Sequence, residues 1–529
     1  MFEEALAAFR TALGADHVLT GDALGRYGAD TLPITRQIPA AIRPGSVEEV
    51  QQVVRIAAAH EVPLYPISTG QNWGYGTSQP MRDGSVIVDL GRMNRVVELN
   101  SELAYVVLEP GVTQRQLFEH LRQQQVRLWL NPTGAGPDCS ILANTLERGF
   151  GIGPNGDHFM AQCGMEIVLP NGEILRTGFG HYPGARSTWV YKYGVGPYLD
   201  GLFTQSGLGI VTKMGVWLVP EPEAFEACYF MCNSESQFGP AVEALRGLLF
   251  DGVFRGPVNL LHRDRVLIML ERYPWDALAG RQLDEARAAR LAHEKKVAIW
   301  NGVGCIAGSR EQVRAARQTI KRALRGKVSK LAFLSEQRLA ILRTFPKAIS
   351  VLMNVNVPEL LHSLSSSYGM MRGTPSKVAL PLAYWRNRRG TPDTDDMNPA
   401  RDRCGLMWFA PIIPMTPRDV ADFRAVIEPI MRKHDFECCI TLTAVNERCF
   451  DCTLPLMYDL ENPAEATRAM ACYRELSERC AEAGFYPYRL GLQSMEKEVG
   501  RDDIFWTVAT SLKRTLDPGN ILAPGRYAR

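Results

Sequence analysis

The strongest structural signal in this chain is Pro66-Ile67-Ser68-Thr69-Gly70-Gln71-Asn72-Trp73-Gly74-Tyr75-Gly76. A helical pattern over residues 47–59 and a short apolar run over residues 62–67 precede it, so we expect a strand that ends in this loop. Glycine lets a backbone approach a ligand and turn its N–H groups towards an anion. We interpret the loop as a diphosphate-binding loop, although the glycines alone also fit an ordinary tight turn.

The segments around this loop predict an α+β fold. Short apolar runs at residues 39–44, 86–90 and 104–108 are expected to be strands, and residues 112–125 a helix. An Asn171-Gly172 turn between two apolar runs predicts a hairpin. The loop has neither the P-loop pattern nor the glycine spacing of a Rossmann turn, so neither of those motifs explains it.

A change of pattern follows Pro220-Glu221-Pro222-Glu223, where we place a domain boundary. Residues 1–30 before it are amphipathic and helical in pattern. The segments after it predict a second α+β domain, because long helices alternate with strands. The helices are expected at residues 237–250, 281–296, 310–324 and 464–483, and the strands at 266–271, 297–303, 436–443 and 453–457.

The composition is that of an ordinary soluble globular protein. The chain has 529 residues, of which 46% are hydrophobic and 22% charged, and its net charge of +2 gives no argument for nucleic acid or an anionic membrane surface. We find no long apolar run that predicts a membrane span, and Met1-Phe2-Glu3-Glu4 does not begin a signal peptide. These features predict a cytoplasmic protein.

The twelve cysteines are scattered, which fits a reducing compartment better than a disulfide framework. One group, Cys438-Cys439 with Cys449 and Cys452, could be considered for zinc. A zinc site needs converging ligands, whereas neighbouring side chains in an apolar strand point to opposite faces. We therefore favour buried thiols and predict no metal site.

Beside the loop, several further motifs resemble the flavoproteins typified by vanillyl-alcohol oxidase and 4-cresol methylhydroxylase, the p-cresol methylhydroxylase fold. The resemblance covers most of the chain, and the motifs occur in the family's order. They are residues 66–76, Val107–Val112, Gly156–Met160, Cys163–Glu166, Asp200–Ser206, Met407–Pro411, Tyr488-Arg489 and Asp517–Arg526.

This resemblance implies FAD, bound by residues 1–220 together with a C-terminal segment, 487–529, and covered by a cap domain, 221–486. The expected diphosphate contacts are Ser68, Thr69, Gly70, Gln71 and Asn72. The glycines expected to let FAD approach are Gly74, Gly149 and Gly153. The residues expected along the adenine or ribityl side are Gln205, Ser206, Gly209, Ile210 and Val211.

The resemblance also implies a catalytic group of Tyr75, Tyr488, Arg489 and Arg526. The tyrosines match those that bind a phenol oxygen in the family, with Arg489 beside them and Arg526 near the flavin or phenolate. Hydroxyl donors and a guanidinium charge in a closed pocket favour phenolate, since a free phenol has a pKa of ~10. The anion then releases a benzylic hydride to flavin N5, and water adds to the resulting p-quinone methide.

The sequence departs from the family pattern at the covalent link to FAD and at the residue that activates water. Leu406 replaces the histidine that holds FAD covalently in one branch, and Tyr384 matches the linking tyrosine of the methylhydroxylase imperfectly. Both covalent FAD at Tyr384 and non-covalent FAD therefore stay open. The residue that activates water is also open, with Glu437 and Asp451 as candidates. His158 is expected to be structural rather than catalytic.

The resemblance implies a dehydrogenase or hydroxylase that passes electrons to a c-type cytochrome. An oxidase that uses O2 and releases H2O2 is the first alternative, and a non-enzymatic subunit that binds flavin or a partner is the second. Family members also suggest a homo-oligomer. A cytochrome partner would favour the periplasm, by export together with that partner, over the cytoplasm.

Overall fold

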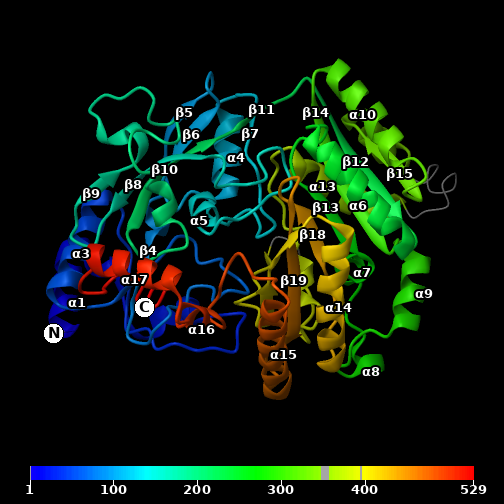
Figure 1. The fold of residues 1–529 in the computed structure, drawn as a ribbon. Helices are drawn as coiled ribbons and strands as arrows, with labels where there is room; N and C mark the ends of the chain where they lie inside the picture. Colours follow the sequence, from blue (N-terminus) through cyan, green and yellow to red (C-terminus); the bar gives the residue numbers. More distant parts are fainter. Residues whose placement is uncertain (1, 347–356, 393–395) are drawn as a thin grey trace.

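The computed structural model describes residues 2–346, 357–392 and 396–529, and it confirms the predicted mixture of helices and sheets. Two regions lie side by side (Figure 1). The first contains the N-terminal helices and strands together with the last helices of the chain, so both termini lie on the same side. The second contains the segments from β12 (Ala224–Cys232) to α15 (Pro463–Glu482).

A small sheet at the start of the first region positions the glycine-rich loop. Its strands, in spatial order, are β1 (Val18–Leu19), β2 (Ala41–Ile42), β4 (Val86–Asp89) and β3 (Leu64–Ile67). The predicted helix is confirmed as α3 (Val47–Ala59), which starts where the Ser46 side chain accepts the Glu49 N–H at 3.2 Å. It packs with α1 (Phe2–Leu13), and β3 leads directly into the loop.

A second, antiparallel sheet completes the scaffold of the first region. Its strands, in spatial order, are β5 (Val96–Asn100), β6 (Tyr105–Leu108), β10 (Ile210–Trp217), β8 (Gln162–Val168) and β9 (Ile174–Arg176). The predicted hairpin is confirmed, since Ile167 pairs with Leu175 across β8 and β9. The helices α4 (Gln114–Gln123) and α5 (Ile141–Leu146) follow capping residues Thr113 and Ser140.

The second region is built on one large sheet. Its strands, in spatial order after β15 (Lys330–Leu334), are β12, β14 (Trp300–Gly308), β13 (Val258–His262), β18 (Thr441–Ala444), β19 (Cys449–Asp459) and β16 (Cys404–Phe409), with β17 (Ile412–Pro414) also on β19. The helices that share its core are α6 (Glu235–Phe250), α10 (Arg310–Leu324), α14 (Pro417–Lys433) and α15.

The alternation of side chains along this sheet gives it a polar row opposite the helices. Leu260, Leu442 and Phe450 belong to the hydrophobic core. Asn259, Thr443 and Asp451 are their neighbours in sequence and pair in register across β13, β18 and β19. Because successive side chains of a strand point to opposite faces, these polar residues lie together on the face away from that core.

Some predicted elements are wrong or shifted. Residues 266–271 form helix α7 (Arg263–Leu270) and not a strand, because so short an apolar run carries no distinguishing period and the N–H of Asp264 is capped by His262. The helix predicted at 281–296 is α9 (Glu285–Lys295), which begins after the cap Asp284. The N-terminal helix ends at Leu13, where Gly14 takes φ 86°.

The C-terminal tail lies against the strand that leads into the glycine-rich loop. After α16 (Met495–Val499) and α17 (Ile504–Leu516), the N–H of Leu64 donates to Ile521 O at 2.7 Å, and the N–H of Ala523 donates to Leu64 O at 2.7 Å. The last residues therefore contribute to the region that contains the loop. The boundaries at residues 220 and 486 stay predictions.

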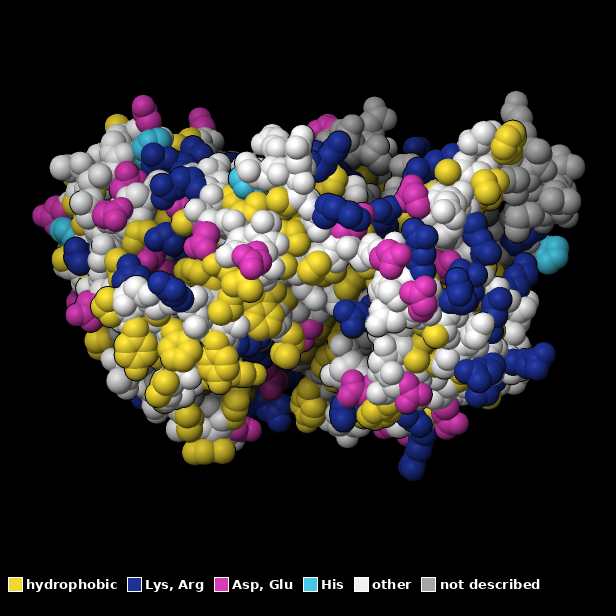
Figure 2. All heavy atoms as spheres, turned by 90° about the horizontal axis from the view of Figure 1, so that it is seen from above, with side chains coloured by type: hydrophobic (Ala, Val, Ile, Leu, Met, Phe, Trp, Pro, Cys, Tyr) yellow, Lys and Arg dark blue, Asp and Glu magenta, His cyan; other side chains and the backbone are white. Residues whose placement is uncertain are grey.

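The upper surface carries basic and acidic side chains side by side, together with hydrophobic side chains on one side (Figure 2). Several exposed large hydrophobic residues come from the segment between β9 and β10, among them Tyr191, Tyr193 and Val195. Among the described residues, we find no helix that combines the length and the apolar character needed to cross a membrane.

Candidate active site

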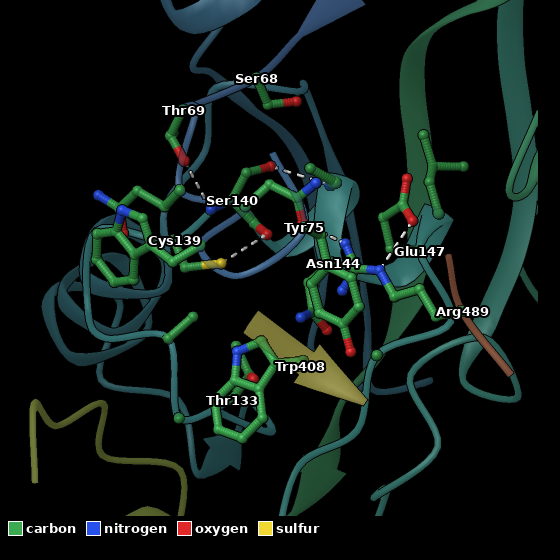
Figure 3. A pocket seen from close by; sticks show the side chains of 18 of the residues that line it. Ser68, Thr69, Tyr75, Thr133, Cys139, Ser140, Asn144, Glu147, Trp408 and Arg489 are labelled. Carbon is green, nitrogen blue, oxygen red and sulfur yellow. Dashed lines mark hydrogen bonds and ion pairs between the residues drawn. The ribbon is translucent and has the colours of Figure 1, made fainter. Parts of the chain in front are cut away.

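A cavity of about 400 Å³ lies between the two regions. The first region contributes the glycine-rich loop, α5 with the turn that follows it, and the start of β10. The second region contributes β13, β18, β19 and Trp408, and the C-terminal segment contributes Tyr488, Arg489 and Arg526. Figure 3 shows side chains from these separate segments pointing towards one another.

The glycine-rich loop fits a bound diphosphate. Within the described residues, the backbone N–H groups of residues 69–72 donate to no backbone or side-chain acceptor, so they are free to bind an anion. The Thr69 hydroxyl accepts the Ser140 N–H at 3.2 Å, which ties the loop to the start of α5 (Figure 3). The predicted contacts that line the cavity are Ser68, Thr69, Gly70, Gln71, Asn72, Gln205, Ser206, Gly209, Ile210 and Val211.

The three predicted glycines serve different purposes. Gly149 lines the cavity, and a Cβ there would meet the Asn144 side chain at 2.2 Å. Gly74 and Gly153 do not line it. A Cβ at Gly74, which has φ 79°, would lie 2.3 Å from the Trp408 indole, and one at Gly153 would lie 2.2 Å from the Asn131 side chain. The positive φ and the Trp408 ring therefore require glycine at Gly74, whereas at Gly153 the nearest obstacle is the end of the Asn131 side chain.

Tyr75, Tyr488 and Arg489 converge at one end of the cavity, as the sequence predicts. The Arg489 guanidinium carbon lies 4.2 Å from the centre of the Tyr75 ring. Burial raises the pKa of the Tyr75 and Tyr488 hydroxyls, and the charge of Arg489 opposes the rise only in part. Both tyrosines therefore stay protonated at neutral pH and can donate hydrogen bonds.

Glu147 joins the predicted arginines, although the sequence reasoning missed it. Arg489 Nε donates to this carboxylate at 3.0 Å, and Arg526 donates to its other oxygen. Arg526 also donates to the Tyr65 hydroxyl at 3.0 Å. Glu147 is only 14% exposed, so this paired cluster holds both guanidinium groups in place with an excess of positive charge.

The polar row of the large sheet also lines the cavity, together with Arg265, and its Asp451 lies close enough to Tyr75 and Tyr488 for its charge to act on both. Thr443 donates to the Asn259 side-chain oxygen at 2.7 Å. Asp451 is 3% exposed, one of its carboxyl oxygens has no hydrogen-bond partner within the described residues, and burial raises its pKa to about 8. The sequence reasoning named Asp451 but missed Arg265, Asn259 and Thr443, because only strand pairing brings them together.

Three other residues singled out in the sequence are not among those that line the cavity. Tyr384 is buried and donates to Asp402 at 2.5 Å, so a covalent bond to FAD at Tyr384 stays a prediction that this geometry does not favour. Glu437 accepts from the buried Arg386 at 3.1 Å and is held in a structural ion pair. His158 bonds with Asn144 at 2.5 Å, and burial lowers its pKa to about 4, as suits a neutral structural histidine.

Metal chemistry gains no support from the cysteines. Within the part of the chain that the structure describes, no group of three or more His, Cys, Asp or Glu side chains is arranged to hold a metal ion. Burial raises the pKa of Cys439 and Cys452 well above the usual value for a thiol, so both are uncharged and inert at neutral pH.

Comparison with known proteins defines the class. The sequence matches the FAD binding domain over residues 38–178 and the C-terminal domain of FAD linked oxidases over residues 363–527. Together these matches cover the glycine-rich loop and the Tyr488-Arg489 pair. The protein is an FAD-linked oxidoreductase. The residues that line the cavity, with the glycine-rich loop among them, could hold that cofactor.

Two similar proteins cover nearly the whole chain. The chain is 43% identical over 529 residues to 1'-carboxy-chondrochloren decarboxylase of Chondromyces crocatus, covering 99% of this chain and 97% of the relative. It is 29% identical to the 4-cresol dehydrogenase [hydroxylating] flavoprotein subunit of Pseudomonas putida, covering 99% and 95%.

Solved structures agree with these relatives. The crystal structure of p-cresol methylhydroxylase with substrate bound matches with a TM-score of 0.89 at 28% identity, covering 99% of this chain and 96% of the other. The 4-ethylphenol oxidase from Gulosibacter chungangensis matches with a TM-score of 0.88 at 28% identity, covering 100% and 97%. The chain belongs to the vanillyl-alcohol oxidase and 4-cresol methylhydroxylase family of flavoproteins.

Proposed function

We propose that this protein oxidises para-substituted phenols at the benzylic carbon. The observation that supports this most strongly is the convergence of Tyr75, Tyr488 and Arg489 at one end of a cavity that also contains the diphosphate loop. Two of the similar structures are named as enzymes of p-cresol and 4-ethylphenol. A para-substituted phenol fits the donors and the charge found here.

The protein's own groups favour removal of the phenolic proton. Tyr75 and Tyr488 remain protonated and can donate to the substrate oxygen, while Arg489 supplies a permanent positive charge. Phenolate pushes electron density towards its para substituent, so a benzylic hydride leaves more easily. Bound FAD supplies the redox chemistry by accepting that hydride. The remaining p-quinone methide is electrophilic at the benzylic carbon.

Water adds to the methide in the first reaction that we propose, and Asp451 is the side chain that exchanges a proton with it. Asp451 lines the cavity, whereas Glu437 does not. Because burial raises the Asp451 pKa to about 8, both its acid and its base forms are present near neutral pH. The product is a benzylic alcohol, and a second round of oxidation would give an aldehyde or a ketone.

Loss of carbon dioxide is a second candidate fate for the methide, favoured by the 43% identity to a relative named as a decarboxylase. If the carbon next to the benzylic carbon carries a carboxylate, its C–C bond to the carboxylate breaks and CO2 leaves. That electron pair forms the side-chain double bond and restores the ring phenolate. This route consumes neither water nor a proton, and it gives an alkenyl phenol.

The electron acceptor is a separate part of the proposal. A c-type cytochrome is our first choice and O2 the alternative, because one similar protein is named a dehydrogenase flavoprotein subunit and another an oxidase. The rate at which air reoxidises the reduced enzyme in a stopped-flow instrument distinguishes the two electron acceptors. Reoxidation within seconds, with stoichiometric H2O2, would rule out the need for a cytochrome.

Assembly and location stay predictions. We expect a homo-oligomer, which light scattering of the holoenzyme will measure. We expect a cytoplasmic protein, with periplasmic export beside a cytochrome as the alternative. Cell fractionation separates these two locations.

Anaerobic titration with a panel of para-substituted phenols tests the proposed function. We expect the flavin absorbance to bleach with phenols that have a benzylic hydrogen. If no member of the panel bleaches the flavin, the non-enzymatic alternative is favoured instead. Oxygen-18 from water in the product identifies hydroxylation, and labelled CO2 from a side-chain carboxylate identifies decarboxylation.

A further inference from the structure

Arg265 is a cation that lines the cavity and has no counter-ion among the residues that the structure describes. It lies in the first turn of α7, and its guanidinium carbon is 5.6 Å from the centre of the Trp408 ring. Within the described residues, its Nε and Nη1 atoms are buried and meet no acceptor. Burial lowers its pKa only to about 10, so the group stays charged at neutral pH.

Arg263, on the same helix, provides a contrast because its guanidinium group is paired with carboxylates. Arg263 donates to Asp264 at 2.8 Å and to the two oxygens of Glu285 at 2.6 and 2.8 Å. An isolated buried charge is costly, and folded proteins pair such charges with an opposite charge or a ligand. The missing partner of Arg265 is therefore expected to come from a bound molecule.

The charged side chains that line the cavity do not supply a counter-ion for Arg265. Among the described residues that line it, three are arginines (Arg265, Arg489 and Arg526) and two are carboxylic acids (Glu147 and Asp451). Glu147 pairs with Arg489 and Arg526, and Asp451 is mostly protonated below about pH 8. Among the described residues of the lining, no ionised carboxylate is therefore left for Arg265.

A second unpaired donor, the Asn259 amide, also lines the cavity. The Asn259 side-chain oxygen accepts the Thr443 hydroxyl at 2.7 Å, which leaves its NH2 group as the free part of the amide. Within the described residues, that nitrogen is buried and donates to no acceptor. A guanidinium and an amide NH2 both lack acceptors here, and a carboxylate offers only acceptors.

We propose that Arg265 binds a carboxylate on the side chain of the phenolic substrate, with the Asn259 amide as a second donor. This inference rests on the proposed function, because it assumes that Tyr75, Tyr488 and Arg489 hold the phenol ring in the same cavity. The substrate class is then a para-hydroxyphenyl alkanoic acid rather than a simple alkylphenol. Arg265 is the residue that selects for the acidic side chain.

Calorimetric titration of the holoenzyme with an unreactive ligand pair tests this. The acid is a para-hydroxyphenyl propanoate with two methyl groups on the benzylic carbon, so that no benzylic hydrogen remains, and the control ligand is its carboxamide. Arg265→Met should weaken binding of the acid by about 10–100-fold, the value of a hydrogen bond to a charged group, and binding of the amide by less than about threefold. Arg265→Lys should recover part of the loss.

The controls separate this proposal from other roles of the arginine. Arg418→Met, which removes a side chain that is 90% exposed, should leave both affinities unchanged. Equal weakening of acid and amide by Arg265→Met would overturn the proposal, as would a wild-type preference for the amide. Loss of FAD from Arg265→Met would overturn it too, because the arginine would then serve the cofactor.

Failure of the proposed function has a different signature. In that case neither para-propylphenol nor the reactive propanoate bleaches the flavin of the wild-type enzyme under anaerobic conditions. If para-propylphenol bleaches it while acid and amide bind alike, the phenol chemistry stands and the carboxylate subsite fails.

Discussion

The arginines that line the cavity differ in whether a carboxylate neutralises them. We call the group around Glu147 the paired end and Arg265 the unpaired end. At one end Glu147 pairs with both Arg489 and Arg526. Arg265, the unpaired end, has no carboxylate partner within the described residues, and Asp451, whose charge acts on Tyr75 and Tyr488, is kept neutral by burial. The paired end is organised before any substrate arrives, which suits a phenolate site. The unpaired end is completed only by a ligand.

Removing both phenol donors should have the largest effect. In the Tyr75→Phe, Tyr488→Phe double variant we expect kcat/KM for para-alkylphenols to fall by about 10³-fold or more, since one donor to a developing oxyanion contributes 10²–10³-fold. Anaerobic flavin reduction measures this loss. Each single variant should lose less, and FAD content should not change. Wild-type reduction rates in the double variant would contradict a phenolate site at this end.

Asp451→Asn should change how stability depends on pH. The folded pKa of Asp451 is raised to about 8, so its stabilising contribution is complete below about pH 4 and is lost as pH rises through about 8. When the pH rises from about 5 to about 8, the free energy of unfolding of the wild-type protein should fall by on the order of 2–4 kcal/mol more than that of the variant. Thermal unfolding of the substrate-free holoenzyme at several pH values measures this. Parallel curves for both proteins would show that Asp451 is not protonated as we describe.

Breaking the paired end should destabilise the protein, whereas neutralising the unpaired end should not. Glu147→Gln leaves two partly buried arginines without their carboxylate partner. We therefore expect the free energy of unfolding to fall by about 2–3 kcal/mol. Arg265→Met is the matched control, and it should raise stability by about 1 kcal/mol because it removes an uncompensated charge. Denaturant unfolding without substrate compares them. Equal destabilisation by both variants would remove the distinction between the two ends.

Tyr384→Phe should have the smallest effect, because Tyr384 lies outside the cavity lining and bonds with Asp402. We expect unchanged FAD content and near wild-type phenol oxidation. Acid precipitation provides the second readout, since it should release the yellow colour from wild type and variant alike. Flavin that stays with precipitated wild type but leaves the variant would restore the covalent bond predicted from the sequence.

The local parts of this structure could be predicted from the sequence. Residues 66–76 carry their own signal, because glycines and a preceding apolar run determine a strand followed by a loop, and the loop lines the cavity. Ser46 and the acidic residues that follow it predict the start of helix α3. Family motifs predict Tyr75, Tyr488 and Arg489 in one site, and all three line the cavity.

The parts that depend on long-range pairing could not be predicted in this way. Glu147 follows a short helix and becomes important only when Arg489, distant in sequence, folds against it. Arg265 directly precedes residues 266–271, which the sequence misassigned as a strand, so its place in a helix beside the cavity could not be inferred. A charged residue has no local feature that shows whether its partner is protein, water or substrate.

The most direct test compares a para-alkylphenol with its O-methyl ether in the anaerobic wild-type enzyme, while the rate of flavin bleaching is followed. The two molecules share the same benzylic hydrogens, but only the phenol can lose a proton between Tyr75 and Tyr488. We predict rapid bleaching by the phenol and none by the ether on the same timescale. Equal rates for both would contradict the claim that the phenolate anion drives the reaction.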